Sequence, residues 1–374
     1  MNKLGRLDGV SRYQQVREIL RQEIIEQNMK PGERLAPERE LAERFGVSRF
    51  TVCRALSALV QEGVLVRQQG NGTFVSSWRE RPIRSRTQTI ALSIPLRRNM
   101  RIPGEIVKGA AHAMQEKDYK LVLTDTSNSA LAEAREIEKH RRERVDGFII
   151  WPVDRDPNYE LLKELLYTGP PIVLIDRFFE DIPSDFVVTD NFWGAYEATR
   201  ILIERGHRRI AHFSALTSRN TALEQRRAGY EKALMDNGID PDPELVCPPM
   251  EYPGAISFRH TMVYLRRLPD PITAVFTVND PYAWAACRAA LDAGLEVPRD
   301  IEIATFFDEL GVDEGLDVPF IRVAQPTYEM GLRAAEVLLD RIEGIGGAEP
   351  IRIFLKPKVV TEDKAEQRTV ISEQ

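Results

Sequence analysis

The sequence predicts an α/β protein in two parts: a small N-terminal unit of helices with a β-hairpin, and a larger part with doubly wound parallel sheets. Two observations support this prediction. Up to residue 75, apolar residues recur at helical spacing in three segments and then alternate as they do in strands. From Thr89 onward, continuous apolar strands alternate with helices, which is the pattern of parallel sheets covered on both faces.

The composition fits two or three domains and does not by itself suggest a nucleic-acid partner. The chain has 374 residues, 43% of them hydrophobic, and a formal net charge of -6. Any argument for DNA binding must therefore rest on local features. The three cysteines show neither metal-ligand spacing nor a disulfide framework, the N-terminus lacks a signal-peptide core, and no stretch approaches a membrane span. We expect a soluble cytoplasmic protein without a metal or cofactor.

The N-terminal unit has the element order of a winged helix-turn-helix. The expected elements are helices over residues 12–27, 36–46 and 47–56, and a hairpin over 63–77. Gly70, Asn71 and Gly72 are expected at the hairpin turn. In such a unit the third helix enters the major groove with its N-terminal end first.

The start of this third helix carries the residues expected to contact DNA. Ser48 caps the helix, and Arg49, Thr51 and Arg54 lie on the side away from its apolar stripe. Arginine forms paired hydrogen bonds with guanine or bridges to phosphate. Arg67, beside the wing, is an expected backbone contact. The alternative is an ordinary solvated helix face.

Residues 12–75 resemble the DNA-binding domain of GntR-family transcription regulators. The resemblance rests on "LAPERELAERFGVSRFTVCRAL" and "EGVLVRQQGNGTFV". It implies DNA contacts at Arg39, Arg49, Thr51, Gly70 and Gly72. The family usually has an arginine where this chain has Cys53, for which we expect a packing or neutral contact role rather than a redox switch. The polar, basic segment 79–88 is expected to be a linker.

In the larger part, polar and aromatic residues follow the ends of several predicted strands. They are Trp151, Asp176, Arg177, Asn279, Asp280, Phe306, Phe307 and Asp308. In open α/β sheets the ligand lies beyond the carboxyl ends of the strands, so two facing lobes would bind it between them. Each residue alone is also typical of a turn or helix cap.

Residues 89–361 resemble the effector domain of LacI/GalR repressors, which is similar to periplasmic sugar-binding proteins. The resemblance rests on segments such as "VDGFIIWP", "PIVLIDR", "RRAGYEKAL" and "VAQPTYEMG". It implies ligand contacts at Asp176, Arg177, Arg226, Asn279 and Gln325. Together the two resemblances indicate a regulator of the arabinose-repressor type.

Two departures from the LacI/GalR pattern concern the ligand. In "TFFD", Phe307 replaces an aspartate that normally binds sugar hydroxyls, unless a one-residue slip lets Asp308 serve. The first loop is basic, with Arg97, Arg98 and Arg101. These arginines suggest an anionic ligand, a sugar acid or sugar phosphate; the alternative is that they are solvated.

The expected organisation is a DNA-binding domain, a linker and an effector domain of two lobes. The boundaries are 1–78, 79–88 and 89–374, with lobe 1 about 89–188 plus 326–350 and lobe 2 about 190–324 plus the C-terminal end. Chain crossovers between the lobes are expected near Thr189, Gln325 and Phe354. Lobe closure on a ligand would change the spacing of two DNA-reading heads in a homodimer.

The expected function is a ligand-responsive DNA-binding regulator, a repressor released from a double-stranded operator by a sugar or sugar derivative. An alternative is a regulator whose sensor lobe no longer binds a sugar and serves for dimerisation or protein interaction. An enzyme is disfavoured, since the five histidines form no metal motif and no nucleophile, base and orienting group stand out. A transport-type binding protein is disfavoured by the N-terminal unit.

Overall fold

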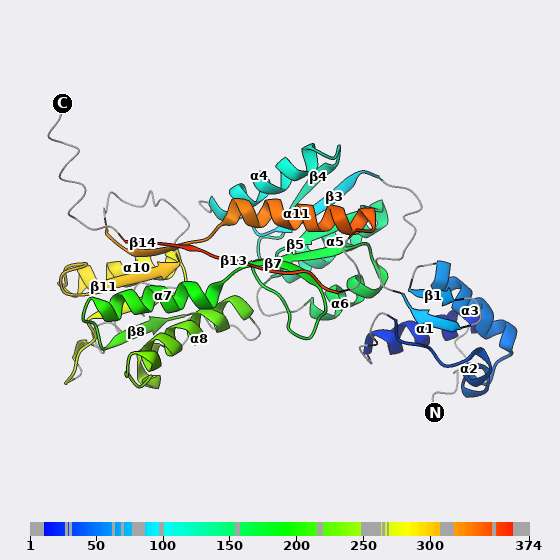
Figure 1. Cartoon of the computed structure of the whole chain (residues 1–374), viewed down its shortest axis with the longest axis horizontal. Helices are drawn as coiled ribbons and strands as arrows, with labels where there is room; N and C mark the ends of the chain where they lie inside the picture. Colours follow the sequence, from blue (N-terminus) through cyan, green and yellow to red (C-terminus); the bar gives the residue numbers. More distant parts are fainter. Residues whose placement is uncertain are drawn as a thin grey trace.

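The structure, a computed structural model, is described for residues 11–26, 29, 32–61, 64–68, 71–76, 87–96, 101–153, 158–214, 220–247, 263, 266–267, 269–306, 318–345 and 349–361. The N-terminal head lies at one end, the first lobe in the middle and the second lobe at the other end (Figure 1). Among these residues, no helix is both long and apolar enough to span a membrane.

The head has the predicted winged helix-turn-helix order. Its elements are α1 (Arg12–Glu26), α2 (Glu38–Phe45), α3 (Arg49–Gln61), β1 (Leu65–Gln68) and β2 (Gly72–Val75). The two strands pair antiparallel, with Gln68 opposite Gly72. One apolar core joins the three helices to the hairpin, with Leu20, Phe45 and Leu56 nearly inaccessible to solvent. This core fixes α3 against the wing.

The first lobe is a parallel sheet between two helical layers. In spatial order its strands are β13 (Arg352–Leu355), β7 (Asp185–Thr189), β6 (Ile172–Ile175), β5 (Gly147–Ile150), β3 (Thr89–Ile94) and β4 (Lys120–Asp125). One face packs on α4 (Arg101–Gln115) and α11 (Thr327–Glu343), the other on α5 (Ala130–Glu143) and α6 (Tyr159–Thr168). Helices α4 and α11 cross closely because Gly331 has no side chain; a Cβ there would lie 2.0 Å from the Ile106 carbonyl oxygen.

The second lobe repeats this plan. In spatial order its strands are β14 (Lys358–Val360), β12 (Ile321–Ala324), β11 (Glu302–Phe306), β10 (Ala274–Thr277), β8 (Ile210–Phe213) and β9 (Val246–Cys247). Helices α7 (Asn191–Glu204) and α8 (Thr221–Asp236) pack on one face and α10 (Asp280–Asp292) on the other, with the short 3-10 helix η2 (Pro243–Leu245) before β9.

The chain passes between the two sheets at three places, close to those expected from the sequence. It leaves β7 at Thr189 for α7, leaves β12 through Gln325 for α11, and passes from β13 to β14 through residues 356–357. Strand β13 pairs with β7 and so adds residues 352–355 to the first lobe, beyond the expected limit of 350.

Strand β14 departs from an all-parallel sheet. It runs antiparallel to β12, because it begins at the crossover where β12 ends. The crossovers also touch each other, since the Asp190 N–H donates to the Leu355 carbonyl at 2.8 Å. The lobes are therefore joined by a compact hinge.

Candidate functional site

The first turn of α3 is fixed by Ser48, as the sequence predicted. The Ser48 hydroxyl accepts a hydrogen bond from the Thr51 N–H at 3.2 Å and lies 2.8 Å from the Thr51 hydroxyl. This N-cap satisfies one of the free N–H groups at the helix start. The remaining free N–H groups and the helix dipole favour an anion at this end.

Three elements of the head meet in one cluster of charges next to this turn. Glu38, at the start of α2, accepts hydrogen bonds from Arg49 of α3 at 3.1 Å and from Arg67 of β1 at 3.0 Å. The same Nη2 atom of Arg67 lies 3.3 Å from the sulfur of Cys53. Arg49 stays 75% exposed, and Arg67 41% exposed. One carboxylate thus positions two guanidinium groups, one from the helix and one from the wing.

The other residues of the head that are expected to contact DNA differ in their exposure to solvent and in the contacts that hold them. Arg39 is 86% exposed and donates to Glu43 on its own helix at 3.2 Å. Arg54 lies over the ring of Tyr13 at 4.1 Å, so α1 holds its guanidinium. Gly72 has φ of 120°, a conformation that favours glycine, and Gly70 lies outside the described residues.

Sequence reasoning missed Phe50, whose side chain is 77% exposed beside Arg49. Apolar side chains of this size are normally buried, because burying a phenylalanine contributes about 1.5–3 kcal/mol. The sequence could have indicated this exposure, because helical periodicity places Phe50 outside the apolar stripe of α3. The exposed surface of the first turn therefore combines charged, hydroxyl and aromatic groups.

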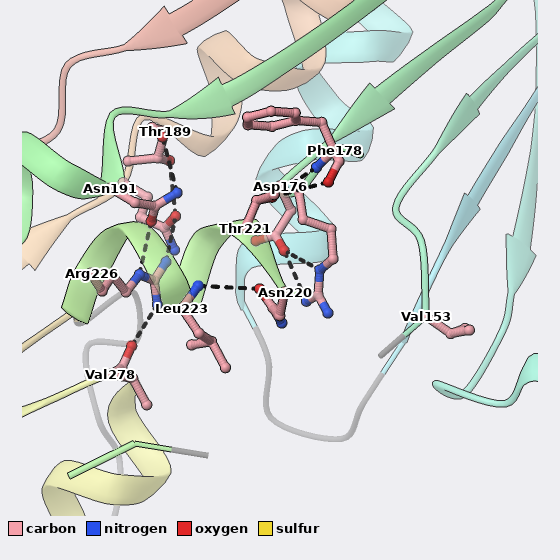
Figure 2. A network of polar contacts seen from close by, with 12 residues as sticks. Val153, Asp176, Phe178, Thr189, Asn191, Asn220, Thr221, Leu223, Arg226 and Val278 are labelled. Carbon is pink, nitrogen blue, oxygen red and sulfur yellow. Dashed lines mark hydrogen bonds and ion pairs between the residues drawn. The ribbon is translucent and has the colours of Figure 1, made fainter. Parts of the chain in front are cut away.

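In the second lobe, Arg226 of α8 stands where strands and crossovers converge (Figure 2). Its side chain donates to the Asn191 amide oxygen at 2.8 Å, to the Val278 carbonyl at 2.5 Å and to the Gln325 amide oxygen at 3.3 Å. Its guanidinium carbon lies 3.7 Å from the centre of the Phe306 ring. The contacts of this cation, which is only 5% exposed, thus include three neutral acceptors and an aromatic face.

Two of the Arg226 partners belong to the hinge. Thr189 donates its hydroxyl hydrogen to the Gln325 amide oxygen at 2.9 Å, and the Asn191 amide donates to the Thr189 carbonyl at 3.0 Å. These contacts link the β7–α7 crossover to the β12–α11 crossover through Arg226. The sequence analysis named Thr189 only as a crossover and did not name Asn191, although "VVTDN" ends a strand in the same way as the segments that were singled out.

On the first lobe, Asp176 and Arg177 follow β6 and form an ion pair. One oxygen of Asp176 accepts from both Nε and Nη2 of Arg177, at 3.0 and 2.9 Å. Asp176 is 8% exposed and has φ of 67°, the left-handed region that few residues other than glycine adopt. Strain of this kind is often found at binding sites.

The two lobes touch directly beside this pair. The Thr221 hydroxyl, at the start of α8, accepts from the Phe178 N–H and donates to the Phe178 carbonyl, both at 3.1 Å. Figure 2 shows Asp176 beside this contact, at the N-terminal end of α8. The structure therefore brings Asp176, Arg177, Arg226 and Gln325 to the region where the lobes meet.

Other predicted ligand contacts have structural roles or are not described. Asn279 caps α10, accepting from the Tyr282 N–H at 3.3 Å, and Trp151 is 5% exposed within the core of the first lobe. Arg101 begins α4. Arg97, Arg98, Phe307 and Asp308 lie outside the described residues. A ligand role for any of these residues stays a prediction.

Two buried titratable groups in the described part of the second lobe have shifted pKa values. Burial lowers the pKa of His212 to about 4, although its ring hydrogen-bonds to the Phe276 carbonyl. Burial likewise raises the pKa of the Cys287 thiol to about 11, which makes it a poor nucleophile. Within the described ranges, no group of three or more candidate side chains could hold a metal ion.

Two known families match this chain. Residues 12–75 match the bacterial regulatory proteins of the gntR family, and residues 104–372 match the periplasmic binding proteins and sugar binding domain of the LacI family. The arabinose metabolism transcriptional repressor of Geobacillus stearothermophilus is 30% identical over 362 residues, covering 95% of this chain and 98% of that protein.

Solved structures give the same result. The complex of the transcriptional regulator CelR with cellobiose has a TM-score of 0.65 and 29% identity, over 84% of this chain and 89% of that one. A LacI-family regulator from Enterococcus faecium with bound ribose has a TM-score of 0.59 and 25% identity, over 73% of this chain and 97% of that one.

Proposed function

The chain belongs to the gntR family of bacterial regulatory proteins and is a DNA-binding transcription regulator with a LacI-type domain; on this premise we propose that it is a repressor released from its operator when a sugar or sugar derivative binds between its lobes. It is a regulator and not an enzyme. A bacterial regulator meets its DNA in the cytoplasm, and we expect this chain to act there.

The observation that carries this proposal is the position of Arg226. Its guanidinium is hydrogen-bonded to Asn191 and Gln325, which lie on two of the three crossovers. A ligand that accepts hydrogen bonds from Arg226 competes with these hinge contacts. Binding would therefore change the relative stability of two lobe arrangements, which is the only way in which a ligand shifts such an equilibrium.

The effector we propose is a sugar, with an anionic derivative as the first variant to test. One relative is an arabinose metabolism transcriptional repressor, and two solved relatives hold cellobiose and ribose. Near the lobe contact, the guanidinium groups of Arg177 and Arg226 offer N–H donors, Arg177 beside the carboxylate of Asp176. A carboxylate or phosphate on the sugar would gain charge-assisted hydrogen bonds there.

On the DNA side, we propose that a homodimer presents two α3 helices to two half-sites. Arg49 and Thr51 would contact bases or phosphates at the N-terminal end of α3, with Arg39, Arg54 and Arg67 nearby. Ser48 and the wing glycines Gly70 and Gly72 would allow the backbone to approach the duplex. Changing the lobe angle would change half-site spacing and weaken binding.

Thermal unfolding with neutral sugars, sugar acids and sugar phosphates tests the effector proposal. A ligand at one hundred times its dissociation constant adds about 2.7 kcal/mol to the free energy of unfolding. The same compound should release the chain from a duplex selected by the chain itself from random sequences. Stabilisation without release would contradict induction. No stabilisation by any sugar would favour a sensor lobe that serves only for dimerisation.

A further inference from the structure

We propose that Asp146 is a positioning residue, which anchors the chain where it enters the first lobe and thereby fixes the point from which the DNA-binding head is attached. The inference rests on the proposed function, a dimer that reads two half-sites, and deepens it by naming a group that sets their spacing. Asp146 stands immediately before β5 and is only 5% exposed. Its carboxylate contacts the residues that precede β3, the first strand of the lobe.

The carboxylate of Asp146 binds two successive backbone N–H groups. Its Oδ1 atom accepts from the Thr87 N–H at 3.0 Å, and its Oδ2 atom accepts from the Gln88 N–H at 2.8 Å. The Thr87 hydroxyl donates to the Arg144 carbonyl at 3.2 Å and lies 3.4 Å from Oδ1. Hydrogen bonds to an ionised carboxylate are about twice as strong as those between neutral groups. One buried side chain thus holds the chain at the point where it joins the lobe.

The backbone at this point is held from two sides. The Gln88 carbonyl accepts from the Lys120 N–H at 2.7 Å, at the start of β4, and the Asp146 N–H donates to the Thr89 carbonyl at 2.8 Å. Gln88 has φ of 49°, in the left-handed region that residues other than glycine rarely adopt. Such a conformation persists only where the surrounding contacts over-determine it. The contacts of Asp146 therefore help to define the direction in which the chain runs from the head into β3.

The head is fixed at its own end of the connecting segment. Ser76, just after β2, is 6% exposed, and its N–H donates to the Val64 carbonyl at 2.9 Å. Residues 77–86 join these two fixed points, and a chain of this length spans at most about 40 Å. A movement of the first lobe reaches the head in full only if Thr87 and Gln88 move with β3. Without Asp146 these two residues would add length and freedom to the connection.

In a dimer, the distance between the two attachment points limits the half-site separations that both heads can reach. Linked binding units strengthen each other only when the connection lets both sites be occupied at once. A carboxylate that only stabilised the fold would leave this choice of separation unchanged. The preference for one half-site spacing is therefore the property that distinguishes positioning from stability.

Three duplexes test the inference with the full chain. The first is selected by the chain from random sequences, the second carries about five extra base pairs between the half-sites, half a helical turn, and the third keeps a single half-site. We expect the insertion to weaken binding by the original chain about a hundredfold, the loss of most of the gain from the second head. For Asp146→Asn we expect about tenfold weaker binding to the selected duplex, and a further loss below about tenfold on insertion. Binding to the third duplex should be unchanged.

The variants are chosen to preserve the fold. Asp146→Asn keeps the shape of the side chain and replaces one acceptor oxygen by a donor group. Thr87→Val removes the hydroxyl that bonds to the Arg144 carbonyl, and should reduce the effect of the insertion by about threefold. Asp242→Asn is the matched control, because Asp242 accepts the Glu244 N–H at 2.9 Å in the second lobe. It should bind all three duplexes as the original chain does.

Thermal unfolding shows whether each variant is folded. A folded Asp146→Asn protein with the full spacing preference of the original chain overturns the inference. If this variant does not fold, the same result for Thr87→Val overturns it. An original chain that tolerates the insertion also overturns the inference, whereas an original chain that selects no duplex contradicts the proposed function itself.

Discussion

The two lobes bury their arginines in different ways. In the first lobe, Arg341 of α11 forms two hydrogen bonds of 2.8 Å with the carboxylate of Asp185, and both side chains are fully inaccessible to solvent. It also donates to the Glu349 carbonyl at 2.8 Å. In the second lobe, Arg226 donates to the oxygens of Asn191, Gln325 and Val278, all of which are neutral.

This difference separates a structural charge from one suited to binding. The charge of Arg341 is matched inside the fold by a bidentate carboxylate, so it ties the end of α11 to the start of β7. The contacts of Arg226 include three neutral dipoles and the Phe306 ring. A ligand oxygen that replaces one of these three acceptors leaves a neutral group, and not a carboxylate, without its hydrogen bond to Arg226.

Breaking the Arg341 pair should have the largest effect on stability. Asp185→Ala leaves a buried positive charge uncompensated, and we expect it to lower the free energy of unfolding by about 3 to 5 kcal/mol. Denaturant unfolding measures this loss. The double variant Asp185→Ala, Arg341→Met should be more stable than the single variant, because it removes both charges. A single variant as stable as the original chain would contradict the comparison.

Removing the charge of Arg226 should abolish the response to effector rather than the fold. With Arg226→Met we expect the stabilisation by saturating effector, about 2.7 kcal/mol at one hundred times the dissociation constant, to disappear. The matched control is Arg227→Met, the next residue along α8, which is 54% exposed and pairs with Glu231. Thermal unfolding with and without effector measures this stabilisation in each variant. Equal responses in both variants would show that Arg226 does not bind the ligand.

His212 shows a third way to bury a basic group, as a neutral ring. Burial lowers its folded-state pKa from 6.5 to about 4, so the unfolded chain takes up a proton below about pH 6.5 that the folded chain does not. The contribution of the neutral His212 ring to the free energy of unfolding is therefore present at neutral pH and is lost as the pH falls. We expect a loss of about 2 kcal/mol between pH 7 and pH 5.

Comparing the original chain with His212→Phe isolates the contribution of His212 to the pH dependence of the free energy of unfolding, because the carboxylates titrate alike in the two proteins. Denaturant unfolding at pH 7 and pH 5 should give a smaller pH dependence for the variant. The opposite result, an unchanged difference between the two pH values, would mean that His212 is protonated inside the fold.

A partly exposed surface arginine should matter least. Arg200 of α7 forms i to i+3 and i to i+4 ion pairs with Glu197 and Glu204, and its side chain is 33% exposed. Exposed pairs contribute about 0–1 kcal/mol, so Arg200→Ala should change the free energy of unfolding by less than about 1 kcal/mol. Denaturant unfolding measures this change, and the result for Arg200→Ala serves as the reference for Asp185→Ala. A loss as large as that of Asp185→Ala would remove the distinction between exposed and buried arginines.

Much of the fold follows from local patterns in the sequence. The helices of the head, its hairpin and the alternation of strands and helices are all visible as apolar periods of 3.6 and 2 residues. Ser48 was predicted as a cap from its position alone, and it caps α3. The antiparallel direction of β14 was not predicted, because it depends on where the third crossover enters the sheet.

The sequence by itself determined which residues stand near each site, and the tertiary structure decided what they touch. A strand end predicted Asp176 from local pattern, whereas Arg226 and Gln325 were implied only by the resemblance to LacI/GalR effector domains. The contact of Arg67 with Cys53 and Glu38 joins residues up to 29 positions apart, on a strand and two helices. Such pairings depend on how the elements pack, because side-chain partners are set by distance in space and not by spacing along the chain.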